Sequence, residues 1–258
     1  LDQRIPPASE SPEIDRLIGV LNRMMDRLQV SFEQAIRFSA DASHELKTPL
    51  AIMQGELENA LQTATPGTPH QKLLTNLLEE TQRMKNTLRS LLLLAQADAG
   101  RIPLSAEHFN LAEELNAILE DTRVICHDHS LAIEVSIVPE ATVCADRGLI
   151  RMAILNLLDN AVKYNEAGGK ISVHLTNENR RAFLRVGNTG PGISPADQPR
   201  VFGRFFRGTA AGHVQKQGSG LGLSLAREIA VAHGGDLRLV ESRAGWTCFE
   251  LVLPLEES

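Results

Sequence analysis

The stretch "DASHELKTPL" at residues 41–50 places a histidine and then a proline inside a segment with helical periodicity. Apolar residues recur at alternating steps of three and four on both sides of it, from Ile14 to Leu28 and from Ala35 to Leu57. Pro49 removes a backbone donor at a cost of about 3 kcal/mol, so we expect a bend just beyond the histidine. The pattern predicts one long heptad-like helix, or two helices joined nearly end to end.

The residues that follow predict an antiparallel helical hairpin. "TATPGTPH" at 63–70 contains prolines and a glycine and is typical of a short loop. A second pattern of three-four steps runs from Leu74 to Ala95, and two long amphipathic helices joined by a short loop pack antiparallel. Further leucines at 73, 78 and 92 widen the apolar stripe beyond a two-helix seam. We therefore predict a homodimer that forms a four-helix bundle.

His44 is predicted to lie on the outer face of the first helix. At about 100° per residue it is about 200° from the seam positions Ala42 and Leu46, so its ring should be exposed. Glu45 lies beside it, and Thr48 is one turn further along the same face. An exposed histidine beside a carboxylate is suited to act as a nucleophile. A solvated surface histidine next to a tolerated proline would give the same local pattern.

Composition excludes several classes of protein. The chain has 258 residues, 43% of them hydrophobic and 22% charged, which is ordinary for one large or two modest globular domains. The net charge of -6, with no block of basic residues, argues against nucleic acid or an anionic membrane surface as the main partner. The cysteines at 126, 144 and 248 are widely spaced, which fits a reducing compartment and gives no zinc pattern. The longest apolar run is too short for a membrane helix and the start lacks a signal-peptide pattern, so we expect this sequence to be soluble.

The second half of the chain predicts an α/β domain that begins near residue 104. Short alternating segments are typical of strands, and helical segments alternate with them. We therefore expect an α/β sandwich with one helical layer on a mixed sheet. The predicted strands are 131–138, 170–175, 182–188, 236–242 and 247–255, and the predicted helices are 110–126, 146–165 and 220–233.

One cluster of polar residues has the spacing of a helix face. In "NLLDNAVKYN" at 156–165, Asn156, Asn160, Lys163 and Tyr164 can line one side of a helix. Amide oxygens suit Mg²⁺, and a lysine can contact phosphate oxygens. The polar outer face of an ordinary helix would look the same.

Two glycine-rich segments are further candidate parts of a ligand-binding site. "VGNTGPGI" at 186–193 is a strand that enters a turn where a flat base can approach the backbone. In "GSGLGLSLAREIAVAHGG" at 218–235, glycines open an amphipathic helix whose free N–H groups offer a phosphate site. The spacing is not the dinucleotide fingerprint, because the strand, crevice and acidic residue of that motif are missing.

Taken in order, these motifs resemble those of sensor histidine kinases of two-component signalling over essentially the whole chain. They match the H box, the N box, the adenine turn, the phenylalanine-containing "VFGRFFRG" at 201–208 and the second glycine box. The residues around the histidine and the "NTGPGI" turn are most similar to the heavy-metal-type subfamily. The resemblance implies a HAMP-like relay helix at 1–30, a dimerisation and histidine phosphotransfer domain at 31–99, a linker at 100–107, and a catalytic ATP-binding domain of the gyrase/chaperone/histidine-kinase type at 108–258.

The resemblance also implies roles for individual residues. His44 matches the phosphoacceptor, Glu45 the acid/base beside it, and Thr48 the residue that orients water for dephosphorylation of the regulator. ATP and Mg²⁺ are the implied cofactors, and Asn160 and Asn156 match the Mg²⁺-linked amides. Residues 194–217 match a mobile ATP lid. The positions that match nucleotide contacts are Asn156, Asn160, Lys163, Tyr164, Asn188, Gly190, Gly192, Phe205, Phe206, Arg207, Gly218, Gly220, Leu221 and Gly222, with Lys216 able to reach the phosphates.

The activity that the resemblance implies is that of a protein-histidine kinase. It would phosphorylate His44 from ATP, pass the group to an aspartate of a response regulator, and dephosphorylate that regulator. The chain would be the cytoplasmic portion of a protein anchored in a bacterial inner membrane through preceding segments. We expect no nucleic-acid partner.

Asn188 is a departure from the family pattern. The family usually has an aspartate there, which accepts a hydrogen bond from the adenine amino group. An amide oxygen also accepts this bond, but more weakly, by about 1 kcal/mol. One alternative that follows from Asn188 is a non-catalytic dimeric scaffold with a degenerate ATP site. A second alternative is another ATPase of the same superfamily, of the gyrase or heat-shock chaperone type, and the H box on a face of the helical bundle argues against it.

Overall fold

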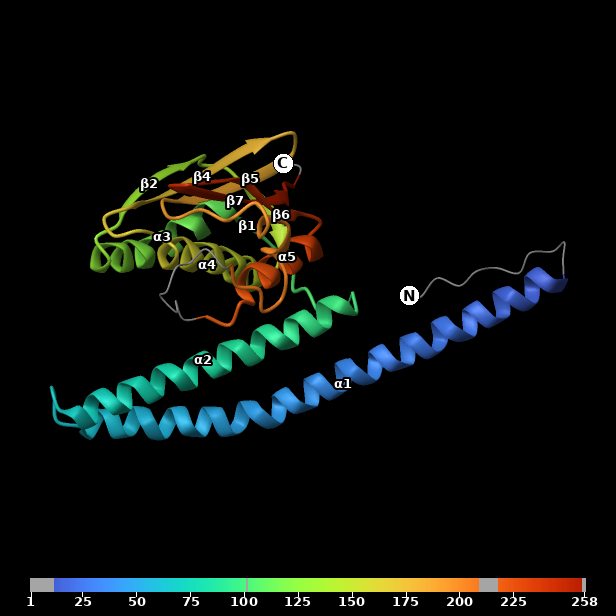
Figure 1. Cartoon of the computed structure of the whole chain (residues 1–258), viewed down its shortest axis with the longest axis horizontal. Helices are drawn as coiled ribbons and strands as arrows, with labels where there is room; N and C mark the ends of the chain where they lie inside the picture. The colour runs from blue at the N-terminus through green and yellow to red at the C-terminus, as the bar shows by residue number, and fades with distance from the viewer. Residues whose placement is uncertain (1–11, 101, 209–217, 257–258) are drawn as a thin grey trace. The chain divides into compact units, whose positions relative to one another are not determined.

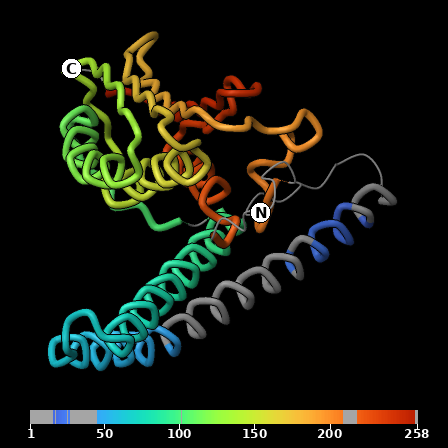
Figure 2. Tube along the Cα trace, turned by 60° about the vertical axis from the view of Figure 1, so that its left-hand side comes forward, coloured from blue at the N-terminus to red at the C-terminus, as the bar shows by residue number. Residues whose placement is uncertain are grey.

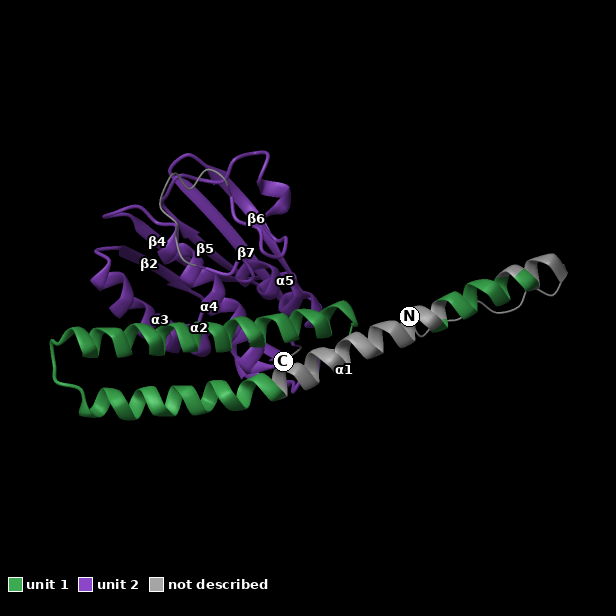
Figure 3. Cartoon of the chain, turned by 60° about the horizontal axis from the view of Figure 1, so that its bottom comes forward, with its two compact units in different colours: residues 1–101 green, residues 102–258 purple. Residues whose placement is uncertain are grey.

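The computed structural model describes residues 12–100, 102–208 and 218–256. Within the first helix it does not describe the side chains at 12–15, 17, 25 and 27–44. The chain divides into two compact units, residues 1–101 and 102–258, which are coloured separately in Figure 3.

The first unit is the predicted helical hairpin. Helix α1 spans Pro12–Thr63 and contains Pro49, and α2 spans Pro69–Asp98. The Thr68 hydroxyl caps α2 by accepting a hydrogen bond of 3.2 Å from the Gln71 N–H. The C-terminal part of α1 runs antiparallel to α2 (Figures 1 and 2), where Lys85 Nζ donates to Gln54 Oε1 at 3.1 Å. The predicted hairpin is confirmed.

The hairpin has two kinds of apolar position. The buried apolar side chains of the described hairpin residues are Leu50, Leu74 and Leu94. Other large apolar side chains of the predicted heptad pattern are exposed in the single chain: Leu46, Met53, Leu77, Met84 and Leu91. On each helix these follow one another at seven-residue intervals, so they form a stripe that the hairpin itself leaves in contact with solvent.

The second unit is built on a five-stranded mixed sheet. Its strands lie in the order β2 (Ala132–Ile137), β4 (Lys170–Glu178), β5 (Arg181–Asn188), β7 (Trp246–Pro254) and β6 (Asp236–Arg243). β2 pairs with β4 in parallel, and the other pairs are antiparallel. Three helices cover one face of the sheet (Figure 1): α3 (Leu111–Asp128), α4 (Arg147–Lys163) and α5 (Gly222–Ala232). The predicted sandwich of one helical layer on a mixed sheet is confirmed.

A small two-stranded ribbon accompanies this sheet. β1 (Glu107–Asn110) pairs antiparallel with β3 (Thr142–Ala145), with His108 opposite Cys144. The sequence analysis did not anticipate either strand. A single 3₁₀ turn, η1 (Gln198–Arg200), lies in the segment between β5 and α5.

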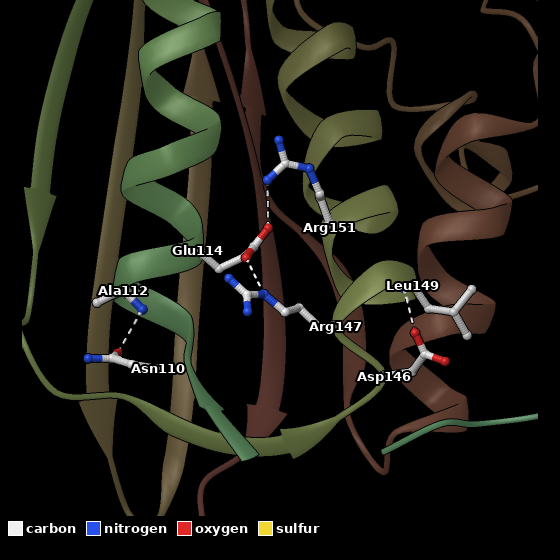
Figure 4. A network of polar contacts seen from close by, with 7 residues as sticks. All are labelled: Asn110, Ala112, Glu114, Asp146, Arg147, Leu149 and Arg151. Carbon is white, nitrogen blue, oxygen red and sulfur yellow. Dashed lines mark hydrogen bonds and ion pairs between the residues drawn. The ribbon is translucent and has the colours of Figure 1, made fainter. Parts of the chain in front are cut away.

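Polar contacts hold α3 against α4 (Figure 4). Asn110 caps α3 through a bond of 3.0 Å from the Ala112 N–H, and Asp146 caps α4 through a bond of 3.0 Å from the Leu149 N–H. Glu114 of α3 accepts hydrogen bonds of 2.6 Å from both Arg147 and Arg151 of α4. The helix α4, which carries the "NLLDNAVKYN" motif, is thereby fixed at its N-terminal end.

The Glu114 carboxylate is buried, with a side-chain exposure of 3%. Burial alone would raise its pKa. The hydrogen bonds and charges of Arg151 and Arg147 outweigh that effect and lower the pKa below its ordinary value. Glu114 is therefore a charged anchor between the two helices.

Among the described residues, no helix combines the length and the apolar character that crossing a membrane would require.

Candidate functional site

A cavity of about 340 Å³ opens in the second unit beside α4. Its volume is within the range of sites that bind small molecules, about 300–1,000 Å³. It is lined by α4, by the segment that follows β5, by the residues that open α5, and by β7. The lining residues that the sequence predicted are Asn156, Asn160, Lys163, Tyr164, Asn188, Gly192, Phe206, Arg207, Gly218, Gly220 and Gly222.

Helix α4 supplies the polar wall of the cavity. Asn156, Asn160 and Lys163 follow one another at helical spacings, while the buried residues of α4 include Leu157, Leu158 and Ala161. The Asn156 Nδ2 donates to the carbonyl of Met152 at 3.0 Å, which orients its Oδ1 away from that carbonyl. The sequence prediction that these residues share a face of one helix is consistent with this geometry.

The glycines of the second glycine segment allow close approach to α4. A Cβ at Gly222 would lie 2.8 Å from Asn156 Oδ1, and a Cβ at Gly218 would collide with Lys163 Nζ. Gly220 has a φ of 71°, in the left-handed region, and a Cβ there would lie 2.8 Å from the carbonyl carbon of Phe205. Gly220 requires glycine, because its backbone is left-handed and meets the Phe205 backbone. At Gly218 and Gly222 the atoms that a Cβ would meet belong to α4 side chains.

Asn188 ends β5 and presents a hydrogen-bond acceptor to the cavity. Its side chain is buried, and Nδ2 donates to the carbonyl of Thr189 at 2.7 Å. This bond fixes which way the amide faces, so Oδ1 is directed away from the Thr189 carbonyl. An amino group of a bound ligand could supply the donor.

Lys163 and Tyr164 lie together at the C-terminal end of α4. The Lys163 ammonium is 5.1 Å from the centre of the Tyr164 ring. Tyr164 is the C-cap residue of the helix, and its N–H donates to the Asn160 carbonyl at 3.0 Å. A cation and an aromatic face therefore border the cavity at one place.

Several lining residues were not predicted. Asp159 precedes Asn160, and surrounding protein raises its pKa while the charge of Lys163 acts in the opposite direction. Its side chain still keeps contact with solvent on the open side. From β7, Thr247 and Phe249 also line the cavity, because Thr247 lies directly opposite Asn188 in the sheet. Strand register, which the sequence pattern alone does not give, was needed to find them.

Other predicted residues lie outside the cavity lining. Phe205 is 61% exposed, whereas its neighbour Phe206 lines the cavity beneath the Arg200 guanidinium. Leu221 is buried and is the N-cap residue of α5. Gly190 does not line the cavity, but its backbone packs so closely on the Tyr164 carbonyl that a Cβ would collide with it.

The predicted phosphotransfer residues belong to the first unit. Glu45 and Thr48 are exposed on α1. The backbone of His44 is helical, but its side chain lies outside the described residues, as do residues 209–217 with Lys216. The predicted exposure of the His44 ring therefore stays a prediction.

The residues around the cavity fit a magnesium nucleotide. Asn188 offers an acceptor of the kind that an adenine amino group needs, and Tyr164 offers a ring on which a base could stack. Lys163 and Arg207 supply cations for phosphate oxygens, and amide oxygens at Asn156 and Asn160 suit a hard divalent cation. The N-cap residue of α5, Leu221, makes no side-chain cap hydrogen bond, so N–H groups of the first turn could donate to a phosphate.

Comparison with known families assigns both units. Residues 34–100 match the His Kinase A (phospho-acceptor) domain, and residues 145–257 match the Histidine kinase-, DNA gyrase B-, and HSP90-like ATPase family. The sensor histidine kinase CusS of Escherichia coli O157:H7 is 32% identical over 254 residues, which cover 98% of this chain and 52% of that protein. The chain spans about half the length of the curated relatives it matches.

Two solved structures support the same assignment. The mycobacterial sensor histidine kinase MprB is 32% identical, with a TM-score of 0.53, and the match covers 59% of this chain and 100% of that one. Full-length ShkA, crystallised in complex with AMPPNP, is 26% identical, with a TM-score of 0.72, and the match covers 87% of this chain and 47% of that one. With a phosphoacceptor domain, an ATPase-type domain and these relatives, the chain belongs to the sensor histidine kinases of two-component signalling.

Proposed function

We propose that this chain autophosphorylates His44 at the expense of ATP and passes the phosphoryl group to an aspartate of a response regulator. The observation that carries the proposal is the cavity, in which Asn188, the polar face of α4 and the glycines before α5 meet around one space. The relative CusS is consistent with the heavy-metal-type subfamily that the motifs resemble.

The chain's own residues would bind and position the nucleotide. Asn188 would accept a hydrogen bond from the adenine amino group, and Lys163 would pair with phosphate oxygens. Asn160 and Asn156 would hold Mg²⁺, which when bound neutralises charge on the phosphates. Little covalent chemistry is then left to the protein beyond positioning.

The phosphoacceptor face of α1 would carry two activities. In the first, a ring nitrogen of His44 would attack the γ-phosphorus of ATP, and the bond to the bridging oxygen would break so that ADP leaves. Glu45 would hold the other ring nitrogen and draw its proton. In the second, the Thr48 hydroxyl orients a water molecule toward the phospho-aspartate of the docked regulator. The proline at 49 lacks a backbone N–H, so it weakens the helix beside the histidine and would let upstream movement change the local geometry.

The outward stripe of the hairpin supports the predicted homodimer. Leu46, Met53, Leu77, Met84 and Leu91 are exposed in the single chain, and a second hairpin that packed on them would complete a four-helix bundle. We further propose that the HAMP-like segment at 1–30 connects this bundle to segments anchored in the bacterial inner membrane, and that the present chain lies on the cytoplasmic side.

The test is labelling with γ-labelled ATP and Mg²⁺. The protein should acquire an acid-labile, alkali-stable label, and His44→Gln should abolish it while nucleotide binding is retained. His127→Gln is the matched control, because that ring is 92% exposed on a helix outside the motif. Labelling that survives His44→Gln would overturn the assignment of the acceptor. A protein that binds neither ATP nor its analogues would instead support the scaffold with a degenerate site.

A further inference from the structure

A histidine, a cysteine and a glutamate from three parts of the second unit meet on its surface. His108 lies on β1, Cys144 lies on β3, and Glu256 follows β7. One ligand atom from each of them, a ring nitrogen, the sulfur and a carboxylate oxygen, lies within 4.8 Å of the other two. None of the three lines the nucleotide cavity. We call this group the His-Cys-Glu cluster.

The fold determines this meeting. His108 and Cys144 are directly opposite in the antiparallel ribbon, so their side chains share a face and their Cβ atoms are about 5 Å apart. Along β3, Val143 and Ala145 are buried, and Cys144 is exposed between them. The cluster therefore lies on the solvent-facing side of the ribbon.

Glu256 is brought to the ribbon by the backbone. Its N–H donates to the carbonyl of Thr142 at 3.1 Å, two residues before the cysteine. Its carboxylate contacts Nδ1 of His108 directly. An ion pair between His108 and Glu256 would explain this contact without a metal. It would not explain why the Cys144 thiol lies on the same face within reach of both groups.

We propose that the His-Cys-Glu cluster binds a divalent transition-metal ion of borderline softness, with Zn²⁺ as the reference ion. Imidazole nitrogen, thiolate sulfur and carboxylate oxygen are the three ligand types that Zn²⁺ takes in proteins, at about 2.0–2.3 Å. Tetrahedral geometry at these bond lengths puts the donors about 3.3–3.7 Å apart. In the structure each ligand atom lies within 4.8 Å of the other two, so the sulfur would have to move closer by at most roughly 1 Å. The direct His108–Glu256 contact would have to open for an ion to sit between the two groups, and water would take the fourth position.

The cluster differs in chemistry from the magnesium site proposed in the cavity. Mg²⁺ prefers an all-oxygen shell, and a thiolate with an imidazole selects softer ions. Among the described residues, this is the only group of three such side chains that could hold a metal. Cysteine spacing could not predict it, because each ligand comes from a distant part of the sequence.

A bound ion would tie the ribbon to the end of the chain. β1 and β3 would be linked to the segment after β7, which in the structure is joined to them through the Glu256 backbone bond and side-chain contact. Because the ion binds the folded arrangement, it should stabilise the second unit by mass action.

The experiment is a titration of the untagged chain with Co²⁺, without nucleotide. We expect one Co²⁺ per chain, a thiolate-to-cobalt absorption band in the near ultraviolet, and displacement of the band by Zn²⁺. Cys144→Ser should abolish the band, and His108→Ala should weaken binding by roughly 10-fold or more. Zn²⁺ should raise the melting temperature of the wild type but not that of Cys144→Ser.

Two control variants match the ligands. Cys248→Ser should leave the band unchanged, because burial raises the pKa of that thiol to about 11 and so disfavours the thiolate. His127→Ala should also leave the band unchanged, because His127 is not part of the cluster. It is a matched control, since its ring lies 3.8 Å from the Asp128 carboxylate and so forms a similar histidine–carboxylate pair. Absence of the band, its survival in Cys144→Ser, or its equal loss in the controls would overturn the proposal.

Discussion

Gly220 and Gly168 have nearly the same backbone conformation in different surroundings. Their φ angles are 71° and 70°, but a Cβ at Gly168 would meet no atom within 4 Å. Gly168→Ala should therefore cost only the left-handed strain, about 1–2 kcal/mol. Gly220→Ala should cost the same strain and should also displace the Phe205 backbone. Phe206 and Arg207, which follow Phe205, line the cavity, so this displacement should change the shape of the site.

The expected result is a loss of nucleotide affinity by roughly 10-fold or more in Gly220→Ala, with little change in Gly168→Ala beyond stability. Isothermal titration with a non-hydrolysable ATP analogue, together with melting temperatures, would check it. Equal affinities in the two variants would show that the close contact at Gly220 has no part in shaping the site.

Asn188 shows how a single residue limits what the sequence can predict. The sequence identified it as a departure from the family pattern and left nucleotide affinity in doubt. In the structure its Nδ2 donates to the Thr189 carbonyl, a bond that an aspartate could not make. The amide therefore satisfies a local backbone acceptor as well as facing the cavity, and only the three-dimensional contact reveals that second role.

At the level of helices, the ion pairs of Glu114 make the packing of α3 on α4 depend on pH. The pKa of Glu114 is lowered below its ordinary value of 4.5, so the charged form stabilises the fold at neutral pH. This stabilisation is present above pH 4.5 and is lost as the pH falls through the lowered folded-state pKa. Acid should therefore loosen the contact between the two helices.

Glu114→Gln should lower the free energy of unfolding by about 1.5–3 kcal/mol at pH 7, because it removes charged hydrogen bonds to both arginines. The difference from wild type should shrink below pH 4.5. Urea unfolding followed by the fluorescence of Trp246, the single tryptophan, reports on the second unit. Glu113→Gln is the control, since that neighbour is exposed. A difference that does not change with pH would contradict the role of the charge.

The longer elements could be predicted from the sequence, and the short ones could not. The strands and helices of the second unit begin and end within a few residues of their predicted limits, because alternation and helical periodicity persist over enough residues. β1 and β3 have four residues each, too few for a period to appear. Lining residues such as Thr247 depend on strand register, which is a tertiary property.

For the proposed dimer, the outward stripe of the hairpin predicts that one substitution should separate the two chains. Met84→Glu would place a charge among apolar side chains of two hairpins, where it cannot be solvated. We expect the mass measured by light scattering to fall from that of a dimer to that of a monomer at micromolar concentration. Val124→Glu is the control, because Val124 is as exposed as Met84 but belongs to the second unit. A dimeric Met84→Glu protein would place the interface elsewhere.

For the signalling cycle as a whole, Thr48 should separate the kinase from the phosphatase. Thr48→Ala removes an exposed hydroxyl from α1 with little loss of helix propensity. The variant should still autophosphorylate and transfer, but dephosphorylate the regulator at least about 10-fold more slowly. The decay of purified phospho-regulator in the presence of ADP measures this. Thr75→Ala, at an exposed threonine of α2, is the control, and equal decay with all three proteins would remove the phosphatase role.

The edge strand β6 bears on how the protein behaves at high concentration. In the described sheet β6 pairs only with β7, and a bulge between Leu239 and Glu241 interrupts its register. Arg238, which pairs with Glu250, and Arg243, which pairs with Glu241, add charges along the same strand. Bulges and charges make a strand edge a poor template for pairing with another chain. The β6 edge of the second unit is thereby protected against edge-to-edge aggregation.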